Sequence, residues 1–281
     1  MAGKVGAASG ESKAGRLFCF GFGYTAQALA RMLEPDGWMV LGTGRSDATL
    51  RFERGRPLDP AAFADATHVL SSIPPDERGD PALDEHAADL ARLQGVRWVG
   101  YLSTTGVYGD HGGGWVDEST AVTPAGERGR RRAEAERGWL ALPLPVHVFR
   151  LPGIYGPGRS QLDGLRAGTA KRIDKPGQVF SRIHVEDIAG ALRLSMARPR
   201  PGAIYNLADD EPAPPQDVVA YAAGLLGMEP PPLVPFAEAK LSPMAASFYA
   251  ESKRVSNDLI KRELGWRPKY PTYREGLRAL L

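Results

Sequence analysis

The feature that most constrains this chain is a glycine turn that joins an apolar run to a helical pattern near the N-terminus. The apolar run Leu17–Phe20 leads into Gly21 and Gly23, and the helical pattern begins at Tyr24. Such a turn directs free backbone N–H groups and the positive end of a helix towards one point. We therefore expect a strand–turn–helix unit that binds the diphosphate of a nucleotide cofactor.

Residues 21–26 fit the dinucleotide-binding pattern G-x-G-x-x-A. Gly21 would allow the tight turn, Gly23 would let the backbone approach the diphosphate, and Ala26 would let the helix pack closely on the strand. Tyr24 and Thr25 complete the predicted cofactor contacts at this turn. A glycine turn that holds no ligand is the alternative interpretation.

The residues that follow the second expected strand, Trp38–Gly42, favour NADP(H) over NAD(H). NAD-binding folds usually place a carboxylate there, which hydrogen-bonds to the ribose. This chain has Arg45 and Ser46 instead, and a guanidinium beside a hydroxyl suits a 2′-phosphate. Asp47 leaves NAD(H) as an alternative, and Arg45 could also cover the adenine or face solvent.

Apolar strand-like runs alternate with helical patterns through the first half of the chain. This alternation predicts an α/β fold, a doubly wound parallel sheet with helices on both faces. Asp80 and Pro81 indicate a helix start, because a carboxylate caps the first N–H groups and proline suits the first helical position. The other expected elements are the strands Thr67–Ile73, Arg97–Ser103 and Val146–Arg150 and the helices Tyr24–Glu34 and Asp80–Leu93.

The composition changes after Leu151, where Pro and Gly become frequent between short helical patterns. We expect residues 1–15 to form a disordered tail and residues 16–150 a dinucleotide-binding domain. Residues 151–281 would form a smaller substrate domain with C-terminal helices, and residues 178–206 would return to the sheet. The helices expected in this half include Gln216–Leu226 and one that begins at Thr272, where Glu275 completes a capping box.

Charge and composition exclude several classes of partner. A net charge of +2 gives no strong attraction to nucleic acid or anionic membrane. No apolar run reaches the roughly 18–20 residues that span a bilayer. The single cysteine, Cys19, cannot form an internal disulfide, and the first fifteen residues lack the apolar core of a secretory signal, so we expect a cytoplasmic protein. Five scattered histidines predict no metal site.

The stretch 128–137 is rich in arginine, but acidic residues stand one helical turn away from these arginines. Such spacing predicts a solvated helix face with internal ion pairs, and it disfavours a nucleic-acid site. The expected pairs are Glu127 with Arg131, Arg130 with Glu134, and Arg132 with Glu136.

Five segments in the same order resemble motifs of one enzyme superfamily, the extended short-chain dehydrogenases/reductases with their NAD-dependent epimerase/dehydratase group. The likeness runs from Leu17 to the C-terminus and implies a Rossmann fold. The segments are Leu102–Gly109, Arg150–Gly158, Arg182–Ala189, Ile204–Leu207, and the C-terminal pair Ser252–Asn257 and Glu263–Pro268.

The sequence departs from that superfamily at its Tyr-x-x-x-Lys pair, in which tyrosine exchanges the proton and lysine lowers its pKa. Arg128 and Arg132 stand at the matching positions. No tyrosine occurs between residues 108 and 155, and no lysine between residues 13 and 171. A guanidinium stays protonated at working pH, so it cannot replace the phenol in acid–base catalysis. The chain therefore resembles the atypical branch that lacks this pair.

The resemblance also implies roles at the end of the fifth strand. Thr104 matches the hydroxyl that polarises a substrate carbonyl, although it could equally cap the turn that follows. Ser103 would border the cofactor and Thr105 the substrate. Tyr108 is the nearest phenol and a candidate proton donor, or its ring packs beneath the site.

Other residues are expected around the cofactor and substrate. The cofactor wall would comprise Ser71, Ser72, Ile73, Pro74 and Pro152. Trp115 would cover the substrate from a glycine-rich flap, or belong to an ordinary exposed loop. Arg182 could bind an anionic group of the substrate. His184 would form a structural hydrogen bond at a helix entrance.

Two functions agree with the sequence. The first is an NAD(P)-binding oxidoreductase or epimerase/dehydratase-like enzyme that acts on a small polar metabolite, such as a nucleotide sugar. The second is a catalytically silent NADP(H)-binding module that senses redox state. Both keep the glycine turn, and only the first needs a reacting group at Thr104.

Overall fold

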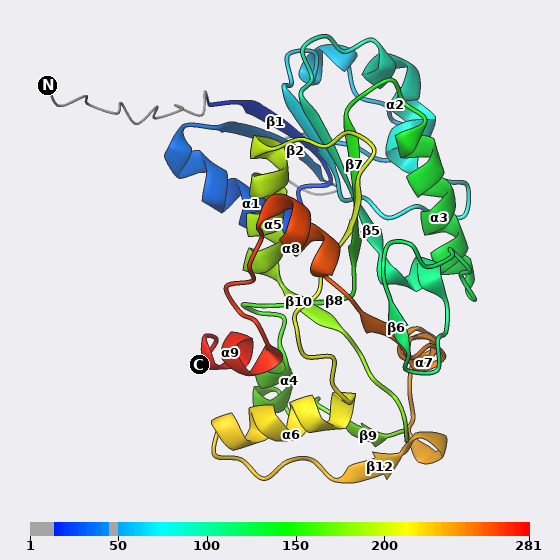
Figure 1. Ribbon diagram of the computed structural model, residues 1–281, viewed down its shortest axis with the longest axis vertical. Helices are drawn as coiled ribbons and strands as arrows, with labels where there is room; N and C mark the ends of the chain where they lie inside the picture. Colours follow the sequence, from blue (N-terminus) through cyan, green and yellow to red (C-terminus); the bar gives the residue numbers. More distant parts are fainter. Residues whose placement is uncertain (1–13, 45–49) are drawn as a thin grey trace, which may run out of the picture.

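The computed structural model describes residues 14–44 and 50–281, and its central element is a parallel sheet of seven strands (Figure 1). Every strand pair in this sheet is parallel, in the order β11-β7-β5-β4-β1-β2-β3. The predicted doubly wound α/β fold is thereby confirmed. The strands are β1 (Arg16–Phe20), β2 (Met39–Gly44), β3 (Leu50–Arg51), β4 (His68–Ser71), β5 (Trp98–Thr104), β7 (Val146–Leu151) and β11 (Ile204–Asn206).

Two pairs of helices cover the two faces of the sheet (Figure 1). Leu17 and Cys19 of β1 pack with α1 (Tyr24–Leu33) and α5 (Val185–Ala197). Phe18 and Phe20 pack on the other face, with α2 (Pro81–Ala91) and α3 (Glu127–Leu140). Side chains on both faces of β1 are therefore buried from Leu17 to Phe20, which explains why these four residues form an apolar run.

In the first half of the chain, capping residues and prolines mark where helices and strands begin and end. Asp80 caps α2, since its Oδ1 accepts from the backbone N–H of Ala82 at 2.9 Å and of Leu83 at 3.2 Å. The strand expected to reach Ile73 ends at Ser71, because two prolines follow and proline has no N–H for a sheet.

The second half adds small elements at the carboxyl ends of the sheet strands (Figure 1). The short strand pairs are β8 (Gly153–Tyr155) with β10 (Arg182–His184), β9 (Arg172–Asp174) with β12 (Leu233–Pro235), and β6 (Trp115–Val116), which belongs to the first half, with β13 (Arg254–Val255). The helices are α4 (Gln161–Arg166), α6 (Pro215–Leu225), α7 (Pro243–Tyr249), α8 (Asp258–Leu264) and α9 (Tyr273–Arg278). Short 3-10 helices are η1 (Glu34–Asp36), η2 (Pro60–Ala62), η3 (Thr105–Tyr108) and η4 (Phe236–Glu238).

One expectation for this half is confirmed, and the domain boundaries stay open. α9 begins at the predicted capping box of Thr272 and Glu275. β11, within the segment 178–206, lies beside β7 in the sheet. The division into domains at residue 151 stays a prediction; β6 from before that point pairs with β13 from after it.

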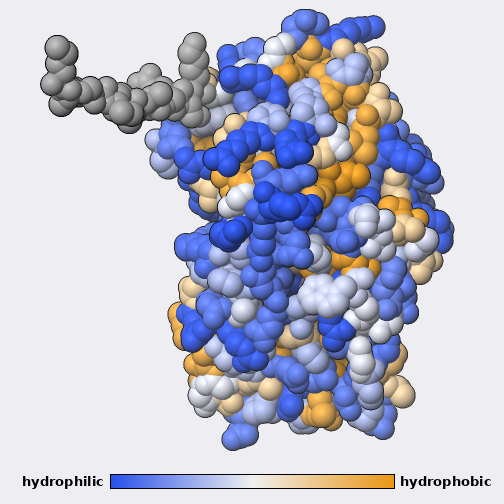
Figure 2. Space-filling view, in the orientation of Figure 1, coloured by the Kyte–Doolittle hydropathy of each residue, from blue (hydrophilic) through white to orange (hydrophobic). Residues whose placement is uncertain are grey.

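The surface seen in Figure 2 is largely hydrophilic, with apolar residues gathered in separate patches. Among the described helices, none combines the length and the apolar character that crossing a membrane requires.

Candidate functional site

The glycine turn after β1 is fixed by contacts that only glycine permits at its first position. Gly21 has a φ of 87°, and a Cβ there would lie 2.9 Å from the Ser72 hydroxyl oxygen. Its N–H donates to Thr43 Oγ1 at 2.8 Å, and its carbonyl accepts from Ser72 Oγ at 2.6 Å. Thr43, at the end of β2, therefore supports the turn; its sequence position carried no signal for this role.

The start of α1 is open in front of the turn. A Cβ at Gly23 would meet no atom within 4 Å, and no side chain caps the helix. The first turn of α1 carries no acidic residue, and Ala26 is fully buried against the sheet. Tyr24 and Thr25 supply further N–H groups at the same end. Uncapped donors beside a side-chain-free backbone suit the diphosphate of a dinucleotide.

The segment after β4 forms a wall next to this turn. Ser71 is fully buried, and its hydroxyl has no partner among the described residues. Ser72 joins the turn through its N–H, which donates to the carbonyl of Phe20 at 2.9 Å. Ile73 is half-buried and Pro74 is exposed. The structure thus brings this segment beside Gly21, and its contact with a cofactor stays a prediction.

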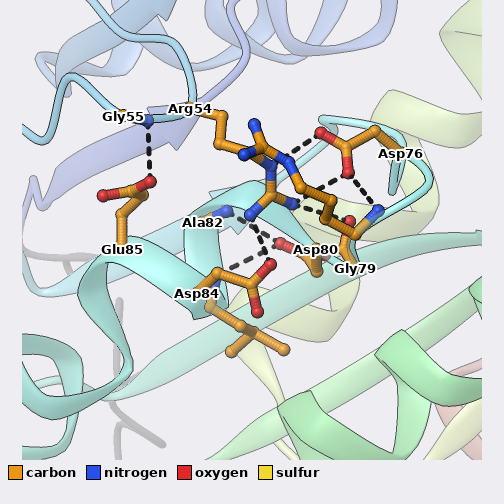
Figure 3. A network of polar contacts seen from close by, with 10 residues as sticks. Arg54, Gly55, Asp76, Gly79, Asp80, Ala82, Asp84 and Glu85 are labelled. Atoms are coloured by element: carbon orange, nitrogen blue, oxygen red, sulfur yellow. Dashed lines mark hydrogen bonds and ion pairs between the residues drawn. The ribbon is translucent and has the colours of Figure 1, made fainter.

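A network of ion pairs holds the loop that continues from this wall (Figure 3). Arg54 Nε lies 2.7 Å from Asp76 Oδ2, and Arg54 Nη1 lies 2.6 Å from Asp84 Oδ2 on α2. Arg54 also donates to the carbonyl of Gly79 at 3.1 Å. The Arg54 guanidinium lowers the pKa of Asp76. The loop is thereby tied to α2 and to the segment after β3, which keeps the wall in one position.

The end of β5 presents Thr104 to the same edge of the sheet. Thr104 Oγ1 accepts from the N–H of Gly106 at 3.2 Å and so caps η3, as one of the two interpretations expected. The hydroxyl keeps its own proton available, because capping uses only a lone pair. Ser103 is buried and donates to Glu136 Oε1 at 2.5 Å, and Thr105 is also buried.

A buried polar network lies behind Thr104. Arg150 on β7 pairs with Glu136 on α3, with Nη2 2.7 Å from Oε2. Arg150 Nη1 also donates to the Tyr108 hydroxyl at 3.0 Å, and that hydroxyl donates to Asn206 Oδ1 at 2.8 Å. Tyr108 is fully buried, and burial raises the pKa of its phenol. The ring therefore packs beneath the site, and its role as a proton donor stays a prediction.

The expected ion pairing along α3 is partly wrong. Glu136 is buried and pairs with Arg150, so it does not pair with Arg132 on a solvated face. Arg130 pairs with Glu127 within the described residues, and no pair with Glu134 is seen there. The spacing alone could not reveal that one acid of the helix faces the sheet.

Arg128 and Arg132, which the resemblance places at the Tyr-x-x-x-Lys positions, lie on α3, which packs against η3 and β5. Arg132 Nη1 donates to the carbonyl of Leu102 at 2.7 Å. Arg128 lies over the ring of Phe248 on α7, with its Cζ 5.2 Å from the ring centroid. Neither side chain offers a group that titrates near neutral pH.

The predicted substrate residues lie in two further places. Trp115 is 62% exposed and lines a cavity of about 490 Å³ with Asp209 and Lys261, beyond the end of β11. Arg182 lies 5.5 Å from the ring of Tyr273, and its Nη1 is buried with no partner among the described residues. The substrate contacts of Trp115 and Arg182 stay predictions.

Three other predictions differ in outcome. His184 caps α5, because its Nδ1 accepts from the N–H of Glu186 at 3.2 Å, which confirms the structural hydrogen bond. Pro152 is half-buried just after β7, and its cofactor contact stays a prediction. Arg45 and Ser46 lie outside the described residues. Within residues 14–44 and 50–281, no group of three or more His, Cys, Asp or Glu residues could hold a metal ion.

Comparison with known proteins gives two curated relatives of interest, while no family model matches the chain. Protein YeeZ of Escherichia coli is 30% identical over 276 residues, which cover 89% of this chain and 94% of YeeZ. A 3-diazoavenalumate denitrifying reductase of Streptomyces is 29% identical over 212 residues, which cover 68% of this chain and 67% of the reductase.

Solved structures share the whole fold. A conserved protein of unknown function from Silicibacter pomeroyi is 55% identical with a TM-score of 0.90, covering 95% of this chain and 98% of its own. MoeE5 in complex with UDP-glucuronic acid and NAD is 21% identical with a TM-score of 0.75, covering 94% and 97%. Human epimerase family protein SDR39U1 with NADPH is 18% identical with a TM-score of 0.74, covering 94% and 98%.

The sequence identity with YeeZ extends over nearly the whole of both chains, which shows that the two proteins are homologous. The strand order of the sheet and the structural neighbours indicate the same fold. The chain belongs to the same family as YeeZ and has the Rossmann-like fold of the NAD-dependent epimerase/dehydratase-like proteins.

Proposed function

We propose that this protein is an NADP(H)-dependent enzyme, an atypical short-chain dehydrogenase/reductase that acts on a small polar substrate. The observation that carries the proposal is the open, uncapped start of α1 at the glycine turn. The complexes of SDR39U1 with NADPH and of MoeE5 with NAD support a nicotinamide cofactor in this fold. The reductase among the relatives supports redox chemistry.

The residues at the sheet edge have distinct proposed roles. The N–H groups at the start of α1 would bind the diphosphate, and the wall Ser71–Pro74 with Ser103 and Pro152 would border the ribose and nicotinamide. Arg45 and Ser46 would bind the 2′-phosphate and so select NADP(H). A nicotinamide held by these residues would supply the hydride-transfer chemistry, next to the Thr104 side of the site.

Thr104 is the residue proposed to position the reacting oxygen. Its hydroxyl accepts from Gly106 N–H and can donate its own proton to a substrate carbonyl. Tyr108 is buried, and its hydroxyl is hydrogen-bonded to Arg150 and Asn206. We therefore propose that Tyr108 holds the segment after Thr104 in place and that a water molecule carries the proton. Trp115 and Arg182 would meet the substrate farther from the nicotinamide.

Titration calorimetry with NADP⁺, NADPH, NAD⁺ and NADH tests the cofactor. We expect NADPH to bind more tightly than NADH. Failure of all four to bind at millimolar concentration would remove the proposal. Stronger binding of NADH would leave a nicotinamide enzyme but reverse the cofactor preference.

Turnover of a carbonyl-substrate panel tests the reaction, with Thr104→Ala and Thr104→Ser compared. Thr104→Ser keeps both the hydroxyl and the cap on Gly106, so we expect it to retain activity. Thr104→Ala should lower kcat by about 10²-fold or more, the usual weight of a lost polarising donor. Binding of NADPH without turnover across the panel would contradict the enzymatic part.

A further inference from the structure

Three arginines, Arg128 and Arg132 on α3 and Arg159 after β8, lie close enough together that the charges of the last two act on Arg128. α3 comes very close to η3, because a Cβ at Gly129 would lie 2.6 Å from the carbonyl oxygen of Gly106. This approach fixes the neighbouring Arg128 beside the turn that Thr104 caps. Arg132 follows one helical turn later and donates to the carbonyl of Leu102 on β5. Both guanidinium groups are thus held at the end of β5.

The third arginine approaches from the side of the glycine turn. Arg159 follows β8, and its Cζ lies 5.8 Å from the ring centroid of Tyr24, the first residue of α1. The Tyr24 hydroxyl donates to the carbonyl of Pro157 at 3.1 Å, which ties the segment carrying Arg159 to the start of α1. Arg159 therefore lies beside the start of α1, and its charge acts on Arg128 of α3.

Arg128 and Arg159 have no ion-paired carboxylate in the part of the chain that the structure describes, whereas the charge of Arg132 acts on the buried carboxylate of Asp80. None of the ion pairs found there includes Arg128, Arg132 or Arg159. The acid that acts electrostatically on Arg128 is Glu251, but its Oε2 lies 2.5 Å from Lys253 Nζ. Arg128 and Arg159 are exposed to solvent, and desolvation of Arg128 by its neighbours, together with the charges of Arg132 and Arg159, lowers the pKa of Arg128. The charges repel one another, so an anion placed among them would be stabilised.

We infer that Arg128 and Arg159 bind an oxyanion of the substrate, a carboxylate or a phosphate, while Thr104 holds the reacting oxygen. The inference rests on the proposed function and specifies the substrate class. Gly129 packs against Gly106 in the turn that Thr104 caps, so its neighbour Arg128 lies on the Thr104 side of the site. A guanidinium can donate two parallel hydrogen bonds to either oxyanion.

The test is calorimetric titration of malonate and of inorganic phosphate, each into protein saturated with NADPH. We expect at least one to bind in the millimolar range. Arg128→Ala and Arg159→Ala should each weaken that binding about tenfold or more. Arg137→Ala is the matched control, because Arg137 is exposed on the same helix and its removal changes the net charge equally. Thermal unfolding of each variant confirms that it is folded.

The outcomes separate the inference from the proposed function. Tighter binding of malonate assigns a carboxylate substrate, and tighter binding of phosphate assigns a phosphorylated one. No binding of either anion at tens of millimolar, or equal weakening by Arg128→Ala and Arg137→Ala, overturns the inference while the cofactor result stands. If NADPH itself does not bind, the proposed function fails, and the same titrations on cofactor-free protein decide the anion site alone.

Discussion

At the scale of single residues, two glycines distinguish backbone strain from lack of space. Gly21 and Gly55 have φ angles of 87° and 76°, so any L side chain would be strained at either position. They differ in surroundings: a Cβ at Gly21 would lie 2.9 Å from Ser72 Oγ and from Ile73 Cγ1, whereas a Cβ at Gly55 would meet nothing within 4 Å. The turn at Gly21 therefore depends on glycine for two reasons and the turn at Gly55 for one.

Gly21→Ala and Gly55→Ala form a matched pair for the first prediction. Gly55→Ala should lower the free energy of unfolding by about 1 kcal/mol, from strain alone. Gly21→Ala should cost about 2–4 kcal/mol, because the wall at Ser72 must also move, and it should abolish NADPH binding. Urea unfolding and calorimetry measure the two effects. Equal destabilisation by the two variants would show that space at Gly21 is not limiting.

The second prediction concerns Arg45, which the sequence predicts to bind the 2′-phosphate of NADP(H). Arg45→Asp should weaken NADPH binding by about 1.5–3 kcal/mol, the usual weight of a hydrogen bond to a charged group. NADH binding should change little, since NADH lacks the 2′-phosphate. Calorimetry with both cofactors measures the difference, and Arg78→Asp controls for the change in net charge. Equal weakening of NADPH and NADH would mean that Arg45 does not contact the phosphate.

At the scale of elements, the predictable parts were those with a local signal. The buried strands are apolar runs, α2 has its Asp80 cap, and α9 has its capping box. The contacts that position the site join residues far apart in sequence, such as Arg54 with Asp76 and Glu136 with Arg150. Such pairs depend on how elements pack, so helical spacing could not identify the partner of Glu136. The glycine turn was predictable, but its support by Thr43 was not.

The third prediction tests how α3 is attached to β7. Arg150 and Glu136 are 3% and 5% exposed at their side chains, so Glu136→Gln leaves a buried guanidinium without its counter-charge. We expect this variant to lose about 3–5 kcal/mol of unfolding free energy. Glu134→Gln on the exposed side of the same helix should change stability by about 0.5 kcal/mol or less. Similar values for both variants, measured by urea unfolding, would contradict the buried pair.

At the scale of the whole molecule, stability depends on pH because burial lowers the pKa of two histidines and raises the pKa of one aspartate. Burial lowers the pKa of His68 in β4 and of His184 at the start of α5 to about 4. Burial raises the pKa of Asp187 to about 7, although its carboxylate accepts from the backbone N–H groups of Lys269 and Tyr270. Acid therefore destabilises the fold through the histidines and stabilises it through Asp187, so the two effects oppose each other between about pH 4 and 7.

The fourth prediction isolates one of these contributions with His184→Asn. The folded-state pKa of His184 lies below its unfolded value of 6.5, so its contribution is fully present above pH 6.5 and is lost as the pH falls towards 4. Asparagine can still cap α5 but does not titrate in this range. The stability of the wild-type protein relative to the variant should therefore fall by about 2 kcal/mol between pH 7 and pH 4.5, after allowance for partial solvent screening. Asp187 and His68 are present in both proteins, so their effects cancel in this difference. Urea unfolding of both proteins at the two pH values measures the difference in their free energies of unfolding. A difference that does not vary with pH would show that the fold does not keep His184 neutral.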